Sequence, residues 1–231
     1  MKRLGSLPLI HQPGEQWMYH SGSDVLGVLI ARASGQTLER FFRDSIFEPL
    51  GMKDSGFHVP SEELERLPPS YARDAQTRAL AVHDGSPDSM WARPPAFPSG
   101  GGGLVSTVDD YLAFCQMMLG KGRHGDARIL SRPSVELMTT DALTLEQKAG
   151  AGIFLPQKRS WGFGMAVVTG RDDLSAVPGR FGWDGGYGTS GYSDPSEELV
   201  GILMTQRLMD SPEPPRTFLD FWTSAYQAID D

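Results

Sequence analysis

Residues 11–57 have the sequence HQPGEQWMYHSGSDVLGVLIARASGQTLERFFRDSIFEPLGMKDSGF and hold Tyr19 directly ahead of a helical pattern. We expect Ser21 or Ser23 to cap a helix over 24–34, because serine is a favoured N-cap and a glycine follows the pattern. The apolar residues of this helix fall on one face: Val25, Leu26, Leu29, Ile30 and Ala33. Tyr19 therefore either packs against the core or carries protons from a fixed point, and its position alone favours packing.

A second helix follows in the same stretch. Thr37 is a suitable cap, and Pro49 with Gly51 would end the helix. Its apolar residues recur at helical spacing: Leu38, Phe41, Phe42 and Ile46. Residues 58–100 are then rich in proline and polar residues, with little periodicity. We expect a long loop region there, of the kind that often borders a functional site.

A glycine run and a third helix follow in SGGGGLVSTVDDYLAFCQMML, residues 99–119. Thr107 is the expected cap, and the apolar face comprises Tyr111, Leu112, Cys115, Met118 and Leu119. A short helix is expected after Pro133. Cys115 is the one cysteine of the chain, which excludes an internal disulfide and a multi-cysteine metal site. Its place in an apolar helical pattern predicts a buried thiol.

From residue 161 the pattern changes to short strands. Four segments have strand character: WGFGMAVV at 161–168, RFGWD at 180–184, GTSGYSD at 188–194 and ELVGILMT at 198–205. The short links between them, such as the turn at Asp194-Pro195, require antiparallel pairing. The last segment predicts an amphipathic helix that aligns Phe218, Trp222, Tyr226 and Ile229.

The order of these elements predicts an α+β fold. We expect one domain over 1–231, mainly helical over 1–150. Over 151–231 we expect antiparallel strands and a terminal helix that covers the sheet. The length of 231 residues and the hydrophobic content of 39% are sufficient for a sizeable core.

Charge and hydropathy exclude several classes of partner. The formal net charge is −8 and the pI is about 5.1, which argues against nucleic acid or an anionic membrane as the partner. No apolar run approaches the ~18 residues of a membrane span. The start, MKRLGSLPLIHQ, is a poor signal peptide because Gly5 and Pro8 break its short apolar stretch. The compartment stays open, with the cytoplasm favoured over export.

Generic motifs indicate no cofactor and no metal. GYGTSG, residues 186–191, matches G-x-G-x-x-G, but strand-like sequence follows it where a dinucleotide site needs a helix. No G-x-S-x-G nucleophile elbow is present. The histidines are scattered along the sequence and none belongs to an H-E-x-x-H motif: His11, His20, His58, His83 and His124. We treat His20 as structural or exposed.

Three stretches together resemble the serine β-lactamase-related hydrolases: residues 11–57, 99–119 and 181–207. This family includes class C β-lactamases, D-alanyl-D-alanine peptidases and lactamase-like esterases. The resemblance implies part of a β-lactamase/transpeptidase-like fold, with the family's first strands and nucleophile helix missing. It also implies acyl-enzyme chemistry on a small ester or amide substrate, in which a nearby base must activate the serine hydroxyl.

The resemblance implies roles for individual residues. Tyr19 matches the tyrosine that shuttles protons, and Ser21 matches the third position of the Tyr-x-Asn/Ser triplet. Trp183-Asp184-Gly185 matches the Lys-Thr-Gly strand motif, with tryptophan in place of the cation. Gly186 would be one oxyanion N–H donor. The loss of the cation removes a contact for a substrate carboxylate, which favours an ester or amide without that group.

Simpler explanations exist for the same residues. Ser21 is explained by an N-cap without catalysis, and the two roles can coexist. Trp183 is as readily a core or pocket-wall aromatic as a substrate contact. Gly185 and Gly186 can serve to let two backbone segments approach closely.

One family motif is absent from the chain. No serine is followed by a lysine three residues later, so the Ser-x-x-Lys nucleophile motif does not occur. We therefore expect the C-terminal part of a serine hydrolase, inactive by itself, that an N-terminal half or another chain completes. The alternative is a non-catalytic module of the same fold that binds a ligand or pairs with a partner. A third hypothesis is an unrelated α+β protein, which a separation of more than about 15 Å between Tyr19 and Gly185, too far for one pocket, would favour.

Overall fold

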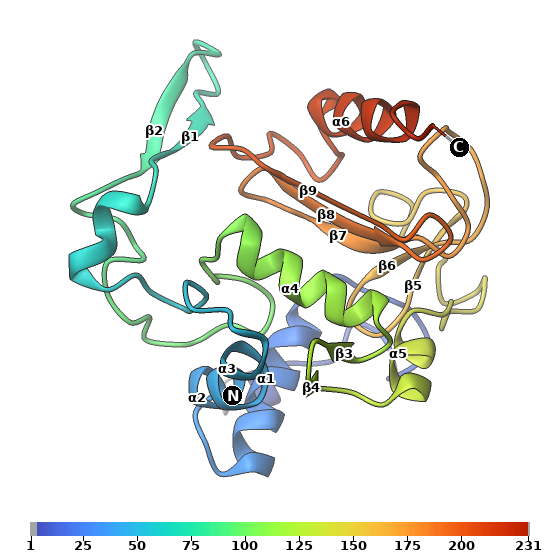
Figure 1. The fold of residues 1–231 in the computed structure, drawn as a ribbon, viewed down its shortest axis with the longest axis horizontal. Helices are drawn as coiled ribbons and strands as arrows, with labels where there is room; N and C mark the ends of the chain where they lie inside the picture. The colour runs from blue at the N-terminus through green and yellow to red at the C-terminus, as the bar shows by residue number, and fades with distance from the viewer. Residues whose placement is uncertain (1–3, 231) are drawn as a thin grey trace.

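A computed structural model of the chain describes residues 4–230 and has an α+β layout, as expected (Figure 1). In the first part, helices contain more residues than strands do, and long irregular segments lie between them. The second part contains a five-stranded antiparallel sheet, within the described residues, in the order β5-β6-β7-β8-β9. Helix α4 packs on one face of this sheet and the terminal helix α6 covers the other (Figure 1).

Helix α1 spans Ser21–Ser34 and ends at Gly35 in the left-handed conformation, with φ of 68°. The expected serine cap is wrong: Ser21 is already the first helical residue, and His20 occupies the N-cap position without a side-chain cap bond. The buried side of α1 is centred on Gly27, where an added Cβ would crowd Leu38. The predicted apolar face points outward instead, with Val25, Leu26 and Leu29 exposed by 45%, 53% and 60%.

The second helical segment begins as predicted. Thr37 Oγ1 accepts a hydrogen bond from the Arg40 N–H, which starts α2 at Leu38–Phe42. A π-helical turn over Arg43–Phe47 and the short α3, Glu48–Leu50, continue the segment to Gly51. Together with α4 and the sheet these segments form the main core, whose buried members are Phe47, Leu50, Met52, Ala113, Met117, Met118, Val135, Val167 and Phe181.

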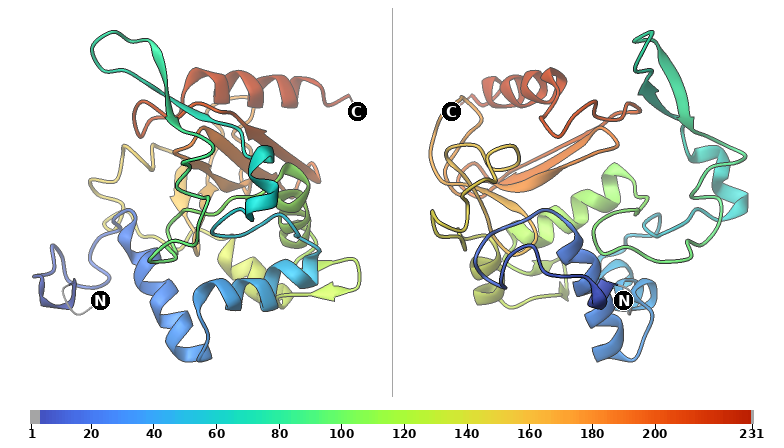
Figure 2. Two further views of the ribbon diagram at one scale, coloured as in Figure 1. Left: turned by 90° about the vertical axis from the view of Figure 1, so that its left-hand side faces the viewer. Right: turned by 180° about the vertical axis from the view of Figure 1, so that it is seen from behind.

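Residues 58–100 are not the uninterrupted loop that the composition predicts. They contain a 3₁₀ turn over Ser61–Arg66 and a hairpin of β1, Ser70–Arg73, and β2, Leu80–Asp84. Figures 1 and 2 show this hairpin projecting from the body. The burial of its strands does not alternate, and β2 is almost entirely exposed. The hydrophobic period that identifies a half-buried strand is therefore absent.

Helix α4 spans Val108–Leu119 and confirms the predicted cap, because Thr107 Oγ1 accepts from the Asp110 N–H. Cys115 on this helix is a buried free thiol, as expected. Helix α5 spans Arg132–Met138 and carries the predicted proline in its first turn. Two short strands that the sequence does not predict, β3 (Arg123–His124) and β4 (Ala127–Arg128), pair between these helices.

The main sheet contains β5 (Arg159–Trp161), β6 (Ala166–Val168), β7 (Phe181–Gly185), β8 (Thr189–Asp194) and β9 (Leu199–Met204). All neighbouring pairs are antiparallel, as predicted. The segment WGFGMAVV does not form one strand. It ends β5, turns and begins β6, because Gly162 N–H donates to Met165 O at the turn.

Helix α6 spans Arg216–Gln227 and buries Phe218, Trp222 and Tyr226 against the sheet. The fourth residue of the predicted face, Ile229, follows the helix end and is 37% exposed. The Trp222 ring lies over Gly201 of β9, where a Cβ would clash with it.

Strand β7 has two different faces and a free edge. Side chains alternate along a strand, so Trp183 and Phe181 point one way and Asp184 the other. Phe181 belongs to the core beneath α4. Asp184 lies on the α6 side, because its carboxylate accepts a hydrogen bond from Ser190 Oγ, which in turn accepts one from the Trp222 indole of α6. Strand β6 pairs only with the beginning of β7, at Phe181 and Gly182. Within residues 4–230, the rest of β7 therefore has a strand partner on one side only.

Candidate active site

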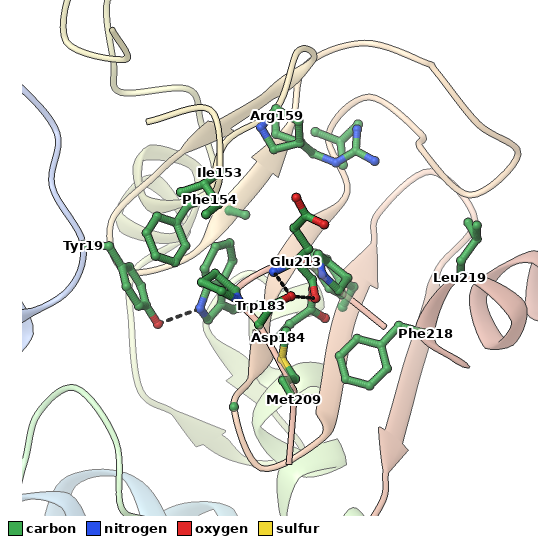
Figure 3. A pocket seen from close by; sticks show the side chains of 18 of the residues that line it. Tyr19, Ile153, Phe154, Arg159, Trp183, Asp184, Met209, Glu213, Phe218 and Leu219 are labelled. Carbon is green, nitrogen blue, oxygen red and sulfur yellow. Dashed lines mark hydrogen bonds between the residues drawn. The ribbon is translucent and has the colours of Figure 1, made fainter. Parts of the chain in front are cut away.

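Tyr19 and Trp183 meet at the centre of the candidate site. The Trp183 indole N–H donates a hydrogen bond of 2.9 Å to the Tyr19 hydroxyl, and the ring centroids are 5.6 Å apart. Tyr19 lies just before α1 and Trp183 lies on β7. Both line a cavity of about 760 Å³, where Figure 3 shows the two side chains in contact. The fold therefore brings together two of the residues that the resemblance singles out.

Aromatic side chains hold Tyr19 in place. Its ring lies 4.7 Å from that of Phe154, 6.0 Å from Trp17 and 6.2 Å from Trp161, between centroids. Trp161 also meets Trp183 edge-on at 4.7 Å. Such pairs stabilise one ring orientation beyond their simple burial. Tyr19 is thus a packed tyrosine whose hydroxyl still reaches the cavity.

The sequence alone did not identify Trp17, Phe154 and Trp161 as neighbours of Tyr19. Trp17 stands two residues before Tyr19, and its main-chain N–H bonds to Gln147 O at 2.8 Å, which orders the approach to the site. Phe154 lies outside the helices and strands, where periodicity carries no information.

Ser21 does not line the cavity. It is exposed and begins α1. The cavity wall at this end is formed by His20 and by Gly101 of the glycine run. Ser99 Oγ donates a hydrogen bond of 2.5 Å to Asp24 Oδ1, which ties the glycine run to α1. His20, which had no predicted role, thus lines the cavity, whereas Ser21 does not, and the catalytic role of Ser21 stays a prediction.

Gly185 and Gly186 lie at the end of β7. A Cβ at Gly185 would clash with the side-chain hydroxyl of Thr189, so a larger residue here would have to displace that side chain. Gly186 lines the cavity, its carbonyl accepts a hydrogen bond of 2.9 Å from Met209 N–H, and an added Cβ would meet open space. The oxyanion role of Gly186 stays a prediction.

Asp184 faces away from Trp183, towards α6. Its carboxylate accepts hydrogen bonds from Ser190 Oγ at 2.5 Å and Tyr192 OH at 3.4 Å. Ser190 in turn accepts from the Trp222 indole at 2.9 Å. Burial raises the pKa of Asp184, and the bond from Ser190 opposes that shift. This network connects β7 to α6 behind the site.

No helix within the described part of the chain combines the length and the hydrophobicity that crossing a lipid bilayer requires.

Comparisons with known proteins identify the family and the fold of the chain. The sequence profile of the Beta-lactamase family matches residues 1–220. An uncharacterized protein of Mycobacterium tuberculosis is 38% identical over 90% of this chain and 53% of its own length. Esterase EstB of Burkholderia gladioli is 29% identical over 94% of this chain and 56% of its own length. The chain thus spans about half the length of the curated relatives it matches.

A solved structure agrees in fold. A simvastatin synthase (LovD) mutant from Aspergillus terreus superposes with a TM-score of 0.80 at 24% identity, over 96% of this chain and 57% of that one. The fold is therefore that of the β-lactamase/transpeptidase-like proteins, as the resemblance implied. With a family profile that extends over nearly the whole sequence, the chain belongs to the β-lactamase family.

Proposed function

We propose that this chain is the C-terminal part of a serine hydrolase that cleaves a small ester or amide through an acyl-enzyme. Tyr19 shuttles the proton in this proposal, and the free edge of β7 positions the substrate. The observation that carries the proposal is the 2.9 Å hydrogen bond between Tyr19 and Trp183, inside a cavity that also reaches Gly186.

The geometry at Tyr19 suits a proton carrier. Its oxygen accepts a hydrogen bond from Trp183, which is a donor only. The tyrosine proton is therefore free to point towards another acceptor in the cavity. A phenol needs an adjacent cation to bring its pKa towards neutrality, and the family's Ser-x-x-Lys motif would supply one.

The open edge of β7 suits a substrate carbonyl. Beyond Gly182 this strand has no partner on the β6 side among the described residues. An unpaired edge presents backbone N–H and C=O groups to an incoming group. The Gly186 N–H, next along the chain, is our candidate oxyanion donor, a type of contact worth about 10²–10³ in rate.

The chemistry around the edge favours a neutral group. Tyr19, Ile153, Phe154 and Trp183 give this end of the cavity an aromatic and aliphatic wall. Trp183 stands where many relatives carry a cation, so a carboxylate on the substrate would find no charge there. The name of the relative EstB, an esterase, supports an ester substrate.

The isolated chain is expected to be inactive. Its 231 residues contain no Ser-x-x-Lys motif, and loss of a nucleophile removes about 10⁶ of rate in a comparable serine hydrolase. A second candidate function is a non-catalytic module that pairs with a partner. The observation in its favour is the exposed apolar face of α1, formed by Val25, Leu26 and Leu29.

The test is to express the chain alone and together with the coding region upstream of Met1, and to assay p-nitrophenyl butyrate and nitrocefin. We expect ester turnover only where a Ser-x-x-Lys segment is present, and its loss when that serine is replaced by alanine. If no form is active while the chain forms a stable complex with another protein, the pairing module is the correct account.

A further inference from the structure

Arg180, directly before β7, is buried and forms no salt bridge with the described residues. It is 4% exposed, and no carboxylate within residues 4–230 forms an ion pair with it. One of its terminal N–H groups donates to Ser175 O at 2.6 Å. Its Nε is buried and has no hydrogen-bond partner. A guanidinium can donate five hydrogen bonds, so most of this capacity is unused.

Aromatic rings surround the guanidinium but do not neutralise it. Its central carbon lies 3.8 Å from the ring centroid of Trp222, 4.4 Å from Tyr192 and 5.6 Å from Tyr226. Burial lowers the pKa of Arg180, yet arginine stays charged under all ordinary conditions. Cation–π contacts recover only part of what a buried charge loses on leaving water.

The charge faces a space that can hold a ligand. Arg180 lines the cavity of about 760 Å³ on the α6 side of β7, behind Trp183. The neighbouring walls are mostly apolar and comprise Ala166, Val168, Phe218, Leu219 and Trp222. Leu219, labelled in Figure 3, lines the cavity and is 53% exposed.

The other charged groups of the cavity form no salt bridge with Arg180, although Asp173 and Asp184 attract it electrostatically from a longer distance. Arg159 binds Asp172 at 3.1 Å and Asp173 at 3.5 Å. Asp184 accepts from Ser190 and Tyr192. Glu213 lines the cavity as well, but forms no ion pair with Arg180. The nearby carboxylates repel any anion, and they repel a doubly charged phosphate more strongly than a singly charged carboxylate.

We propose that this half of the cavity binds a carboxylate that carries an apolar body. The carboxylate accepts hydrogen bonds from the Arg180 guanidinium, whose fork matches a carboxylate in shape. The apolar body lies against Phe218 and Leu219. Two sources supply this chemistry: a free amphiphilic acid, or an acidic side chain on a polypeptide segment that packs beside α6. The site lies on the opposite face of β7 from Trp183, so it does not depend on the proposed reaction.

Octanoate is the probe, measured against octanamide by isothermal titration calorimetry with the purified chain. We expect saturable 1:1 binding of octanoate, and affinity lower by roughly 10–100-fold for octanamide, which lacks the charge. Arg180→Met should weaken octanoate binding by a similar factor. Arg132→Met is the control, because it removes an arginine of α5 that lies outside the cavity and is paired with Glu136, and it should change the affinity less than about threefold.

The same titration on the chain co-expressed with an upstream Ser-x-x-Lys segment distinguishes the two sources. Loss of octanoate binding there identifies a polypeptide carboxylate as the occupant, and retained binding identifies a free acid. The absence of saturable octanoate binding to the chain alone overturns the proposal, and so does equal affinity for octanamide. If Arg180→Met does not fold, the comparison of octanoate with octanamide on the unaltered chain still tests whether binding depends on the carboxylate charge.

Discussion

The Tyr19 hydroxyl and the Trp183 indole nitrogen lie 2.9 Å apart, although 164 residues separate them in the sequence. The bond joins the segment before α1 to the strand that borders the cavity. The Tyr19 hydroxyl oxygen uses one of its lone pairs to accept this bond. Whatever reaction the site performs, these two side chains must be treated as one unit.

The first prediction concerns this pair. A double-mutant cycle with Tyr19→Phe and Trp183→Phe should give a coupling of about 0.5–1.5 kcal/mol in the free energy of unfolding, measured by urea denaturation of the isolated chain. Tyr19→Phe with Trp17→Phe is the control cycle, because Trp17 contacts the Tyr19 ring at 6.0 Å without that hydrogen bond. Equal coupling in the two cycles would mean that ring packing, and not the hydrogen bond, joins the pair.

The second prediction compares two helix starts. Thr107→Ala removes the side chain that accepts from Asp110 N–H and should lower the free energy of unfolding by about 1 kcal/mol. Ser21→Ala at the start of α1 removes no cap bond and should change stability by less than about 0.5 kcal/mol. Thermal and urea unfolding of both variants provide the measurement. A larger loss of stability for Ser21→Ala would show that Ser21, and not His20, acts as the N-cap of α1.

The third prediction concerns glycines beside the sheet. Gly201→Ala would place a Cβ against the Trp222 ring and should destabilise the protein by about 1–3 kcal/mol. Gly186→Ala serves as the control, since its Cβ meets nothing within 4 Å. If Gly201→Ala is neutral in urea denaturation, the contact between α6 and β9 is looser than described.

The fourth prediction concerns pH. The pKa of Asp184 in the folded protein is raised above its ordinary value of 3.8, mainly by burial. Folding therefore favours the protonated carboxyl, and this contribution is complete below pH 3.8 and is lost as pH rises through the raised pKa. The wild type should lose stability relative to Asp184→Asn over that interval, because the variant has no charge to bury.

Paired urea unfolding curves of the two proteins between pH 3.5 and pH 7 test this prediction. Titration of the other carboxyl groups cancels in the difference between the proteins. A difference that moves in the opposite direction would show that the bonds from Ser190 and Tyr192 outweigh burial.

Much of the fold could be predicted where local chemistry decides it. The threonines at positions 37 and 107 cap their helices because threonine accepts from a free N–H at the third helical residue. The strands β7, β8 and β9 follow from short β-rich runs with turn residues between them. The buried face of α6 follows from helical spacing, apart from Ile229 beyond its end.

The errors arise where local signals compete or are absent. Serine is a favoured N-cap residue, but α1 already begins at Ser21, so His20 occupies the N-cap position. The β1–β2 hairpin carries no periodic burial, so its pattern resembles a loop. Its turn depends instead on Asp74, whose carboxylate accepts from the N–H groups of Gln76 and Thr77.

The candidate site also combines residues that the sequence predicts with residues that it does not. Tyr19, Trp183 and Gly186 could be named from the sequence because the family resemblance marks them, and the fold places all three on one cavity. Phe154 and Arg180 could not be named, since their importance comes from distant parts of the chain. Arg180 in particular acquires its role only when three rings, two of them on α6, close around it.

The most direct test of the central claim is the turnover of p-nitrophenyl butyrate by the chain completed with a Ser-x-x-Lys segment, with and without Tyr19→Phe. A proton-shuttling tyrosine should contribute about 10²–10⁴ in kcat, so the variant should lose that much while still binding substrate. Trp17→Phe, which alters a ring beside Tyr19 and no proton-carrying group, should retain turnover within about tenfold. Full activity of Tyr19→Phe in the completed enzyme would contradict the account.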